Sequence, residues 1–82
     1  ARNAKKIKQF ELRRDIVTAA IEKAEQRIDE IDGSFCKPGF FEETSESKVR
    51  SMQQERDKLA ADLDQLMAEW EEIEAALEDN GG

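Results

Sequence analysis

The first fourteen residues of the chain concentrate side chains that bind phosphate groups. They hold six lysines and arginines and a single acid, Glu11. Such cations neutralise the phosphates of a nucleic acid without reading its base sequence, and this kind of binding weakens steeply as salt rises. The basic segment, residues 2–14, therefore predicts contact with a nucleic acid. The predicted phosphate-binding residues are Lys5, Lys6, Lys8, Arg13 and Arg14.

The far end of the chain supports an opposing interpretation. Residues 62–79 hold eight acidic side chains and no basic one, and the net charge of the whole chain is −7. If the chain folds back on itself, this acidic segment lies beside the basic one. Ion pairs within the molecule would then use part of the basic charge, and the remaining carboxylates would repel a phosphate backbone.

Other kinds of site have little support. The chain has no histidine and one cysteine, Cys36, so a transition-metal site would depend on carboxylates alone, and an internal disulfide is impossible. No Gly-rich phosphate loop precedes a Lys-Ser or Lys-Thr pair. The sequence predicts no catalytic residue, no metal ligand and no cofactor in this chain. With no apolar run of bilayer length, a cytoplasmic location without membrane contact is expected.

Two apolar stripes, each with alternating steps of three and four residues, must position these charges. The first stripe comprises Ile7, Phe10, Arg14, Val17, Ile21, Ala24, Ile28, Ile31 and Phe35. The second comprises Val49, Met52, Arg56, Leu59, Leu63, Leu66, Trp70, Ile73 and Leu77. This spacing is that of a coiled-coil seam, and Gly33, Pro38 and Gly39 supply a turn between the stripes. The sequence predicts an all-α fold: a two-helix antiparallel coiled-coil hairpin, expected to be a monomer.

A single hairpin is expected over residues 1–82. In order, we expect a helix over about residues 3–32, a turn over residues 33–43, a second helix over about residues 44–78 and a frayed tail over residues 79–82. Asn3 is the expected N-cap and Gly33 the residue that ends the first helix, while Thr44 or Ser45 caps the second. The chain does not begin with Met, and we interpret it as a C-terminal fragment of a larger ATPase.

Equal stripe lengths predict a register that places Ile7 opposite Leu77 and Phe35 opposite Val49. In this register Arg14 lies opposite Trp70, so that its guanidinium could cover the indole face. Trp70 itself is expected to pack in the seam. Arg56 lies opposite Ile28, where its stem can pack while its charge reaches solvent.

Four apolar residues are candidates for contact with a partner protein. Leu12 and Ile16 lie on one helical face, but that face points away from the seam. Either the seam shifts near the N-terminus or these two residues dock on another molecule. Phe40 and Phe41, in the turn, are expected to fold back over the end of the seam or to form a docking tip.

The second helix contains a recognisable motif. Residues 70–74, Trp-Glu-Glu-Ile-Glu, match the Trp-Glu-Glu-Leu-Glu-like signature of the C-terminal coiled-coil domain of the F subfamily of ATP-binding cassette (ABC) ATPases. Residues 21–25 and the pair Pro38 and Phe41 echo further family features. The chain resembles this domain over roughly residues 17–78. It departs from it at Thr18, where proline is common, and over residues 5–10, where a lysine-rich, tyrosine-containing segment is common.

This resemblance implies two ATPase cassettes upstream, with ATP bound in the parent protein and not in this fragment. Many relatives act on ribosomes, and in some the hairpin binds DNA. We therefore predict a non-catalytic domain that binds DNA, or ribosomal RNA, through its basic segment. The alternative is a protein-interaction or spacer hairpin that docks on the parent ATPase or a ribosomal partner. Two further alternatives are an arm like the coiled-coil tail of valyl-tRNA synthetase, and a hairpin that opens and pairs with a second chain as a longer dimer.

Overall fold

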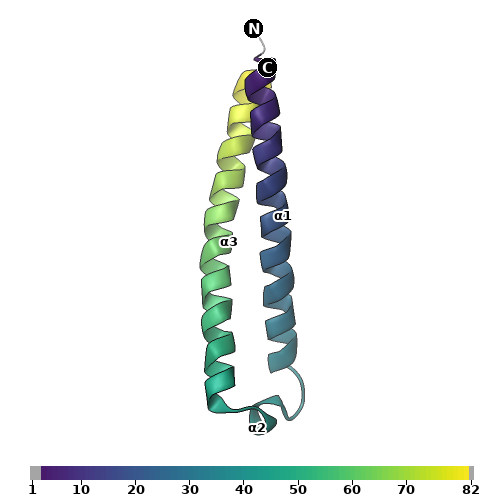
Figure 1. The fold of residues 1–82 in the computed structure, drawn as a ribbon, viewed down its shortest axis with the longest axis vertical. Helices are drawn as coiled ribbons and strands as arrows, with labels where there is room; N and C mark the ends of the chain where they lie inside the picture. The colour runs from purple at the N-terminus through teal and green to yellow at the C-terminus, as the bar shows by residue number, and fades with distance from the viewer. Residues whose placement is uncertain (1–2, 82) are drawn as a thin grey trace.

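The computed structural model describes residues 3–81. Two long helices, α1 (Ala4–Phe35) and α3 (Glu46–Gly81), run antiparallel, and the short helix α2 (Phe40–Glu43) lies between them in sequence. Figure 1 shows α1 and α3 side by side, with α2 closing one end of the rod. The start of α1 and the end of α3 lie together at the other end, here called the open end. The molecule measures 62 × 16 × 14 Å. The predicted all-α antiparallel hairpin is confirmed.

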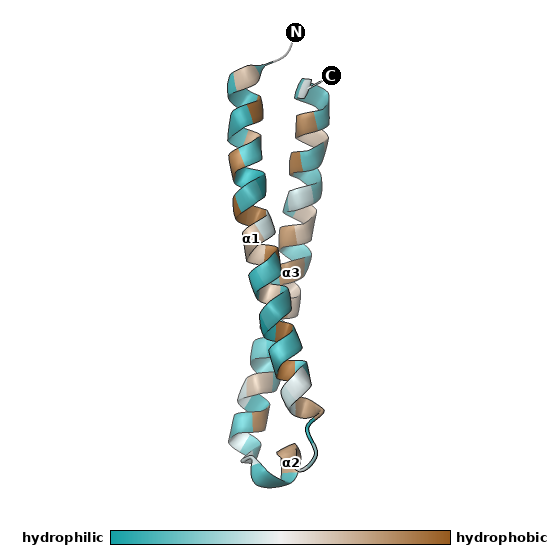
Figure 2. Ribbon diagram, turned by 90° about the vertical axis from the view of Figure 1, so that its right-hand side faces the viewer, coloured by the Kyte–Doolittle hydropathy of each residue, from teal (hydrophilic) through white to brown (hydrophobic). Residues whose placement is uncertain are grey.

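A narrow line of apolar contacts joins the two helices. Val17, Ala24 and Ile31 of α1 are buried at seven-residue spacing, together with Ile7 of α1 and Ile73 of α3. Seven residues is almost two turns of an α-helix, so these side chains stay on the face that meets the partner helix. Figure 2 shows hydrophobic positions recurring along both helices, which cross over one another.

Polar side chains cap both long helices at their N-terminal ends. The Asn3 side chain accepts a hydrogen bond from the Lys6 backbone N–H at 3.1 Å, which confirms the predicted N-cap of α1. The Ser45 hydroxyl accepts one from the Lys48 backbone N–H at 3.2 Å, at the start of α3. Both contacts satisfy N–H groups that have no acceptor within the helix.

The prediction that Gly33 ends the first helix is wrong. α1 continues to Phe35, and Gly39, not Gly33, takes the left-handed conformation, with φ of 78°. The Phe35 ring lies 5.7 Å from that of Phe40 and 5.6 Å from that of Phe41, centroid to centroid. These aromatic contacts need Phe35 held in a last helical turn, and they outweigh the roughly 1 kcal/mol that a helical glycine costs.

The second helix also has different limits from those predicted. α3 begins at Glu46 and reaches Gly81, so residues 79–81 of the expected frayed tail are helical, while residue 82 lies outside the described part. The Asn80 side-chain amide donates to the Ala76 carbonyl at 2.8 Å and closes part of this last turn. The segment between the long helices, residues 36–45, is shifted toward the C-terminus relative to the expected turn over residues 33–43.

Ion pairs between the helices agree with the predicted register. Arg13 pairs with Glu69 and Arg27 with Glu55, so that both partners move by two heptads from one pair to the next. On the other flank Arg14 pairs with Glu74 and Arg56 with Asp32. Pairs that flank an apolar seam at heptad spacing are a device by which coiled coils set alignment.

Candidate functional site

Three of the five predicted phosphate-binding residues lie free on the surface of the open end. Lys5, Lys6 and Lys8 are exposed on the first turns of α1. Within residues 3–81 none of the three forms an ion pair. Their ammonium groups are therefore available to an anion. Arg2 of the basic segment lies outside the described residues.

The other two predicted residues are engaged within the hairpin. The Arg13 Nε donates to Glu69 Oε1 at 2.6 Å, and a second nitrogen of the same guanidinium contacts this oxygen. The Arg14 Nη1 lies 3.4 Å from Glu74 Oε1. The acidic helix thus takes up part of the basic charge, as the opposing interpretation expected, and the structure does not bring the five cations together as one free cluster.

Two further arginines bind carboxylates farther along the rod. Arg27 donates two hydrogen bonds to Glu55, of 2.7 and 2.9 Å. These bonds hold the pKa of the Glu55 carboxyl below its ordinary value. Arg56 grips Asp32 through contacts of 2.5 and 3.0 Å, and the pKa of Asp32 is lowered for the same reason. The charge of Arg56 is used inside the hairpin, in keeping with a role in register.

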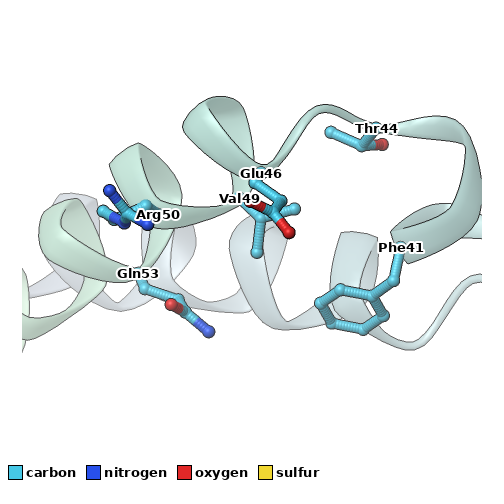
Figure 3. A pocket seen from close by; sticks show the side chains of 6 residues that line it. All are labelled: Phe41, Thr44, Glu46, Val49, Arg50 and Gln53. Atoms are coloured by element: carbon cyan, nitrogen blue, oxygen red, sulfur yellow. The ribbon is translucent and has the colours of Figure 1, made fainter.

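Leu12 and Ile16 are exposed, at 59% and 60% of their surface. The seam does not shift to cover them, so the first of the two alternatives is wrong, while docking of these two residues on another molecule stays a prediction. At the tip Phe41 is 53% exposed, whereas Phe40 is half-buried. Figure 3 shows the Phe41 ring on one side of a hollow of about 410 Å³, with Arg50 and Gln53 of α3 on the other side.

Trp70 does not pack inside the seam as expected. Its side chain remains 39% exposed, whereas Val17 and Ile73 are 1% and 5% exposed. The indole is therefore partly open to solvent, and it borders two hollows on the surface of the rod. We predicted that the Arg14 guanidinium would cover the indole face of Trp70. It instead donates a hydrogen bond to the carboxylate of Glu74.

Met67 is an exposed apolar residue that sequence reasoning missed. It is 44% exposed and borders the same hollow as Trp70. The available signal was its position three residues before Trp70 and one residue after the seam residue Leu66. In an α-helix that spacing places a side chain beside the seam and next to the tryptophan.

Comparison with known families places the hairpin in one of them by its sequence. The family model described as the ABC transporter C-terminal domain matches residues 5–75, which include most of both long helices and all of the turn. The chain belongs to this family. No curated protein and no solved structure matches the chain.

Membership in the ABC transporter C-terminal domain family agrees with the ABC ATPase part of the predicted resemblance. A domain of this family is non-catalytic in itself. Among the residues that the structure describes, no three acidic or cysteine side chains gather as metal ligands. No helix in that same part of the chain has the length and apolar character needed to cross a bilayer.

Proposed function

We propose that this ABC transporter C-terminal domain is a non-catalytic, DNA-binding hairpin of an F-subfamily ABC ATPase, with ribosomal RNA as the second possible ligand. One observation carries the proposal. Lys5, Lys6 and Lys8 are exposed at the open end, and none forms an ion pair within residues 3–81. Three free ammonium groups within two helical turns suit adjacent phosphates of one backbone.

Screening by salt weakens the electrostatic objection. Lys5 and Lys8, three residues apart, are neighbours on the exposed surface of α1. Exposed Glu71 and Glu78, seven apart, belong to α3, where they border a hollow that Arg14 of α1 also lines. The rod is about 15 Å wide, and the Debye length at physiological salt is about 8 Å. Any exposed carboxylate that lies more than a Debye length from a phosphate at Lys5 or Lys8 is therefore largely screened from it.

Arg13 and Arg14 have a different role in this proposal. Their guanidinium groups bind Glu69 and Glu74, and so they align the helices instead of contacting phosphates. We expect Arg13→Gln with Arg14→Gln to lower the melting temperature of the hairpin while leaving DNA affinity within about twofold, because the free cations remain.

The test is fluorescence anisotropy of a short labelled DNA duplex with the 82-residue chain. Three phosphate contacts give a slope of about −2.7 in log affinity against log salt, so affinity should fall about 40-fold between 50 and 200 mM salt. Lys5→Gln with Lys6→Gln and Lys8→Gln should remove measurable binding. A single-stranded ribosomal-type RNA in the same assay distinguishes the two nucleic acids.

A matched control removes the same number of charges elsewhere. Lys23, Lys37 and Lys48 are exposed and lie far from the open end, and their replacement by glutamine should leave affinity within about twofold. Equal loss in this control, or absence of binding at 50 mM salt, contradicts the proposal. Circular dichroism verifies that both triple variants keep the hairpin.

The parent protein enters the proposal through the Trp-Glu-Glu-Ile-Glu motif at residues 70–74 and the family match. Two upstream ATPase cassettes that bind ATP, action on ribosomes and a cytoplasmic location accompany the F-subfamily assignment. The hairpin would then bind nucleic acid for a parent protein that hydrolyses ATP in its upstream cassettes.

A second candidate function is docking on a protein, either the parent ATPase or a ribosomal partner, with the rod as a spacer. The exposure of Leu12 and Ile16 favours this function, because removing exposed apolar side chains from water makes binding of a partner favourable. Phe40 and Phe41 at the tip are the other candidate contacts. Docking of this kind would persist at high salt and be lost in Leu12→Ser with Ile16→Ser.

A further inference from the structure

One flank of the rod is hollowed on both sides of Trp70. The first hollow, of about 350 Å³, lies between Trp70, Met67 and the α1 residues Thr18 and Ile21. The second, of about 580 Å³, lies between Trp70, Leu77 and the Arg14–Glu74 pair. Trp70 borders both hollows, and the two together are here called the Trp70 groove.

The walls of the first hollow suit an aliphatic side chain. Ile21 is half-buried, and the thioether of Met67 and the indole of Trp70 are partly exposed beside it. A methionine adapts its shape to a guest, and an indole offers a large rigid apolar surface. Covering these residues would remove exposed apolar surface from water, which favours binding.

The rim of the groove is acidic. Glu22 and Glu25 border the first hollow, and Glu71 and Glu78 border the second. All four are exposed, and within residues 3–81 none forms an ion pair. The one cation on the lining, Arg14, is balanced by Glu74. An occupant therefore meets an uncompensated negative potential, which attracts cations and repels phosphate.

We infer that the Trp70 groove binds a basic amphipathic helix of a partner protein. An aliphatic side chain of that helix enters the hollow beside Met67, and its lysines or arginines lie against the four rim carboxylates. A cation above the free part of the indole gains a further attraction to its π face. From Arg14 to Glu25 the groove is about 17 Å long, which is about three turns of a helix.

The groove begins at Leu77 and Glu78, level with Ile7 in the register, and runs from there toward the tip; none of the three open-end lysines lines it. It has the opposite charge, so the same region cannot serve for phosphate contact. Docking in the groove does not depend on DNA binding, and either can fail while the other holds. The net charge of −7 also makes the chain as a whole attractive to basic segments.

The test uses Trp70 as its own reporter, since it is the only tryptophan in the chain. The probe is a synthetic Lys/Leu amphipathic helix of about 18 residues, about 27 Å long. Binding should shift the emission of Trp70 to shorter wavelength as water leaves the indole. A Glu/Leu peptide of the same length should cause no shift, and a Lys/Ala peptide should bind more weakly because it has no side chain to fill the hollow.

Two charge-matched variants locate the contact. Glu22→Gln with Glu25→Gln and Glu71→Gln should weaken binding about tenfold, since three exposed ion pairs are lost. The control carries Glu42→Gln, Glu43→Gln and Glu46→Gln near the tip and should stay within about twofold of the unaltered chain. Both sets keep the side-chain length and helix propensity, so folding is preserved.

Other outcomes overturn the inference. Equal weakening in both variants, or equal binding of the Glu/Leu peptide, would remove the role of the rim. An emission shift caused by DNA would assign the groove to nucleic acid. A shift that grows with protein concentration without peptide, together with a dimer in sedimentation, would assign it to a second copy of the chain.

Discussion

Ile31 offers the sharpest test of the seam. Its side chain is 0% exposed in α1, whereas Ile16 of the same helix is 60% exposed. Replacing each isoleucine by alanine removes the same three carbon atoms and gives the same gain in helix propensity. The difference between the two variants therefore isolates the value of burial.

The magnitude follows from the atoms removed. Three carbons at about 0.8 kcal/mol each give about 2.4 kcal/mol of lost transfer free energy for Ile31→Ala. A cavity adds to this loss, and the better helix propensity of alanine returns about 0.4 kcal/mol, so the net destabilisation should be about 3 kcal/mol. Ile16→Ala should change the free energy of unfolding by less than about 0.5 kcal/mol in either direction.

Urea unfolding followed by circular dichroism measures both variants. We expect the midpoint to fall for Ile31→Ala with an unchanged slope, and the melting temperature to drop by more than about 10 °C. Ile16→Ala should overlay the unaltered chain. If the two variants lose equal stability, the helices do not pack along the face that contains Ile31, and the proposed register is refuted.

Three other changes test the turn and the ion pairs. Gly39→Ala should destabilise by about 1 kcal/mol, because φ of 78° strains a residue with a Cβ. Gly33→Ala should instead stabilise by about 0.5–1 kcal/mol, since it lies in α1 and an added Cβ meets nothing within 4 Å; melts showing the same sign for both glycines would contradict the assignment of the turn. Glu55→Gln should lower the melting temperature at pH 7. The lowered pKa of Glu55 means that its contribution is complete above its ordinary value of 4.5 and is lost as pH falls through the folded-state pKa; the gap between variant and parent should therefore close in acid, and a constant gap would refute the pairing.

The hairpin could be predicted because its pattern is long and repeated. Each stripe runs through nine seam positions, and only one antiparallel alignment pairs them from end to end. The Arg27–Glu55 pair, outside the stripes, later agrees with that alignment. A pattern that extends over so many residues still predicts the hairpin when a single seam position, such as Arg56, carries a charge.

The end of α1 could not be predicted from local preference alone. Gly33 has a weak tendency to end a helix, and the ring contacts of Phe35 with Phe40 and Phe41 override it. Those contacts depend on how the turn closes, and no property of residues 32–36 taken alone reveals them.

The candidate sites depended on choices that spacing does not make. Heptad position assigns Trp70 to a face but does not state how much room that face has, so its exposure was missed. Arg14 can reach either an indole or a carboxylate, and the ion pair with Glu74 is the choice observed. For Arg13, Lys5 and Lys8 the sequence identified the cations, but only the structure separates the paired arginine from the free lysines.

The placing of both helix ends at the open end makes the rod a lever. Anything that holds the chain through that end leaves α2 and the exposed ring of Phe41 about 60 Å away. A hinge rotation of about 10° there would sweep the tip through about 11 Å. Because the helices are joined by an apolar seam and, within residues 3–81, by four cross-helix ion pairs, the rod would transmit such a rotation, turning a small angular change at its base into a large displacement at its tip.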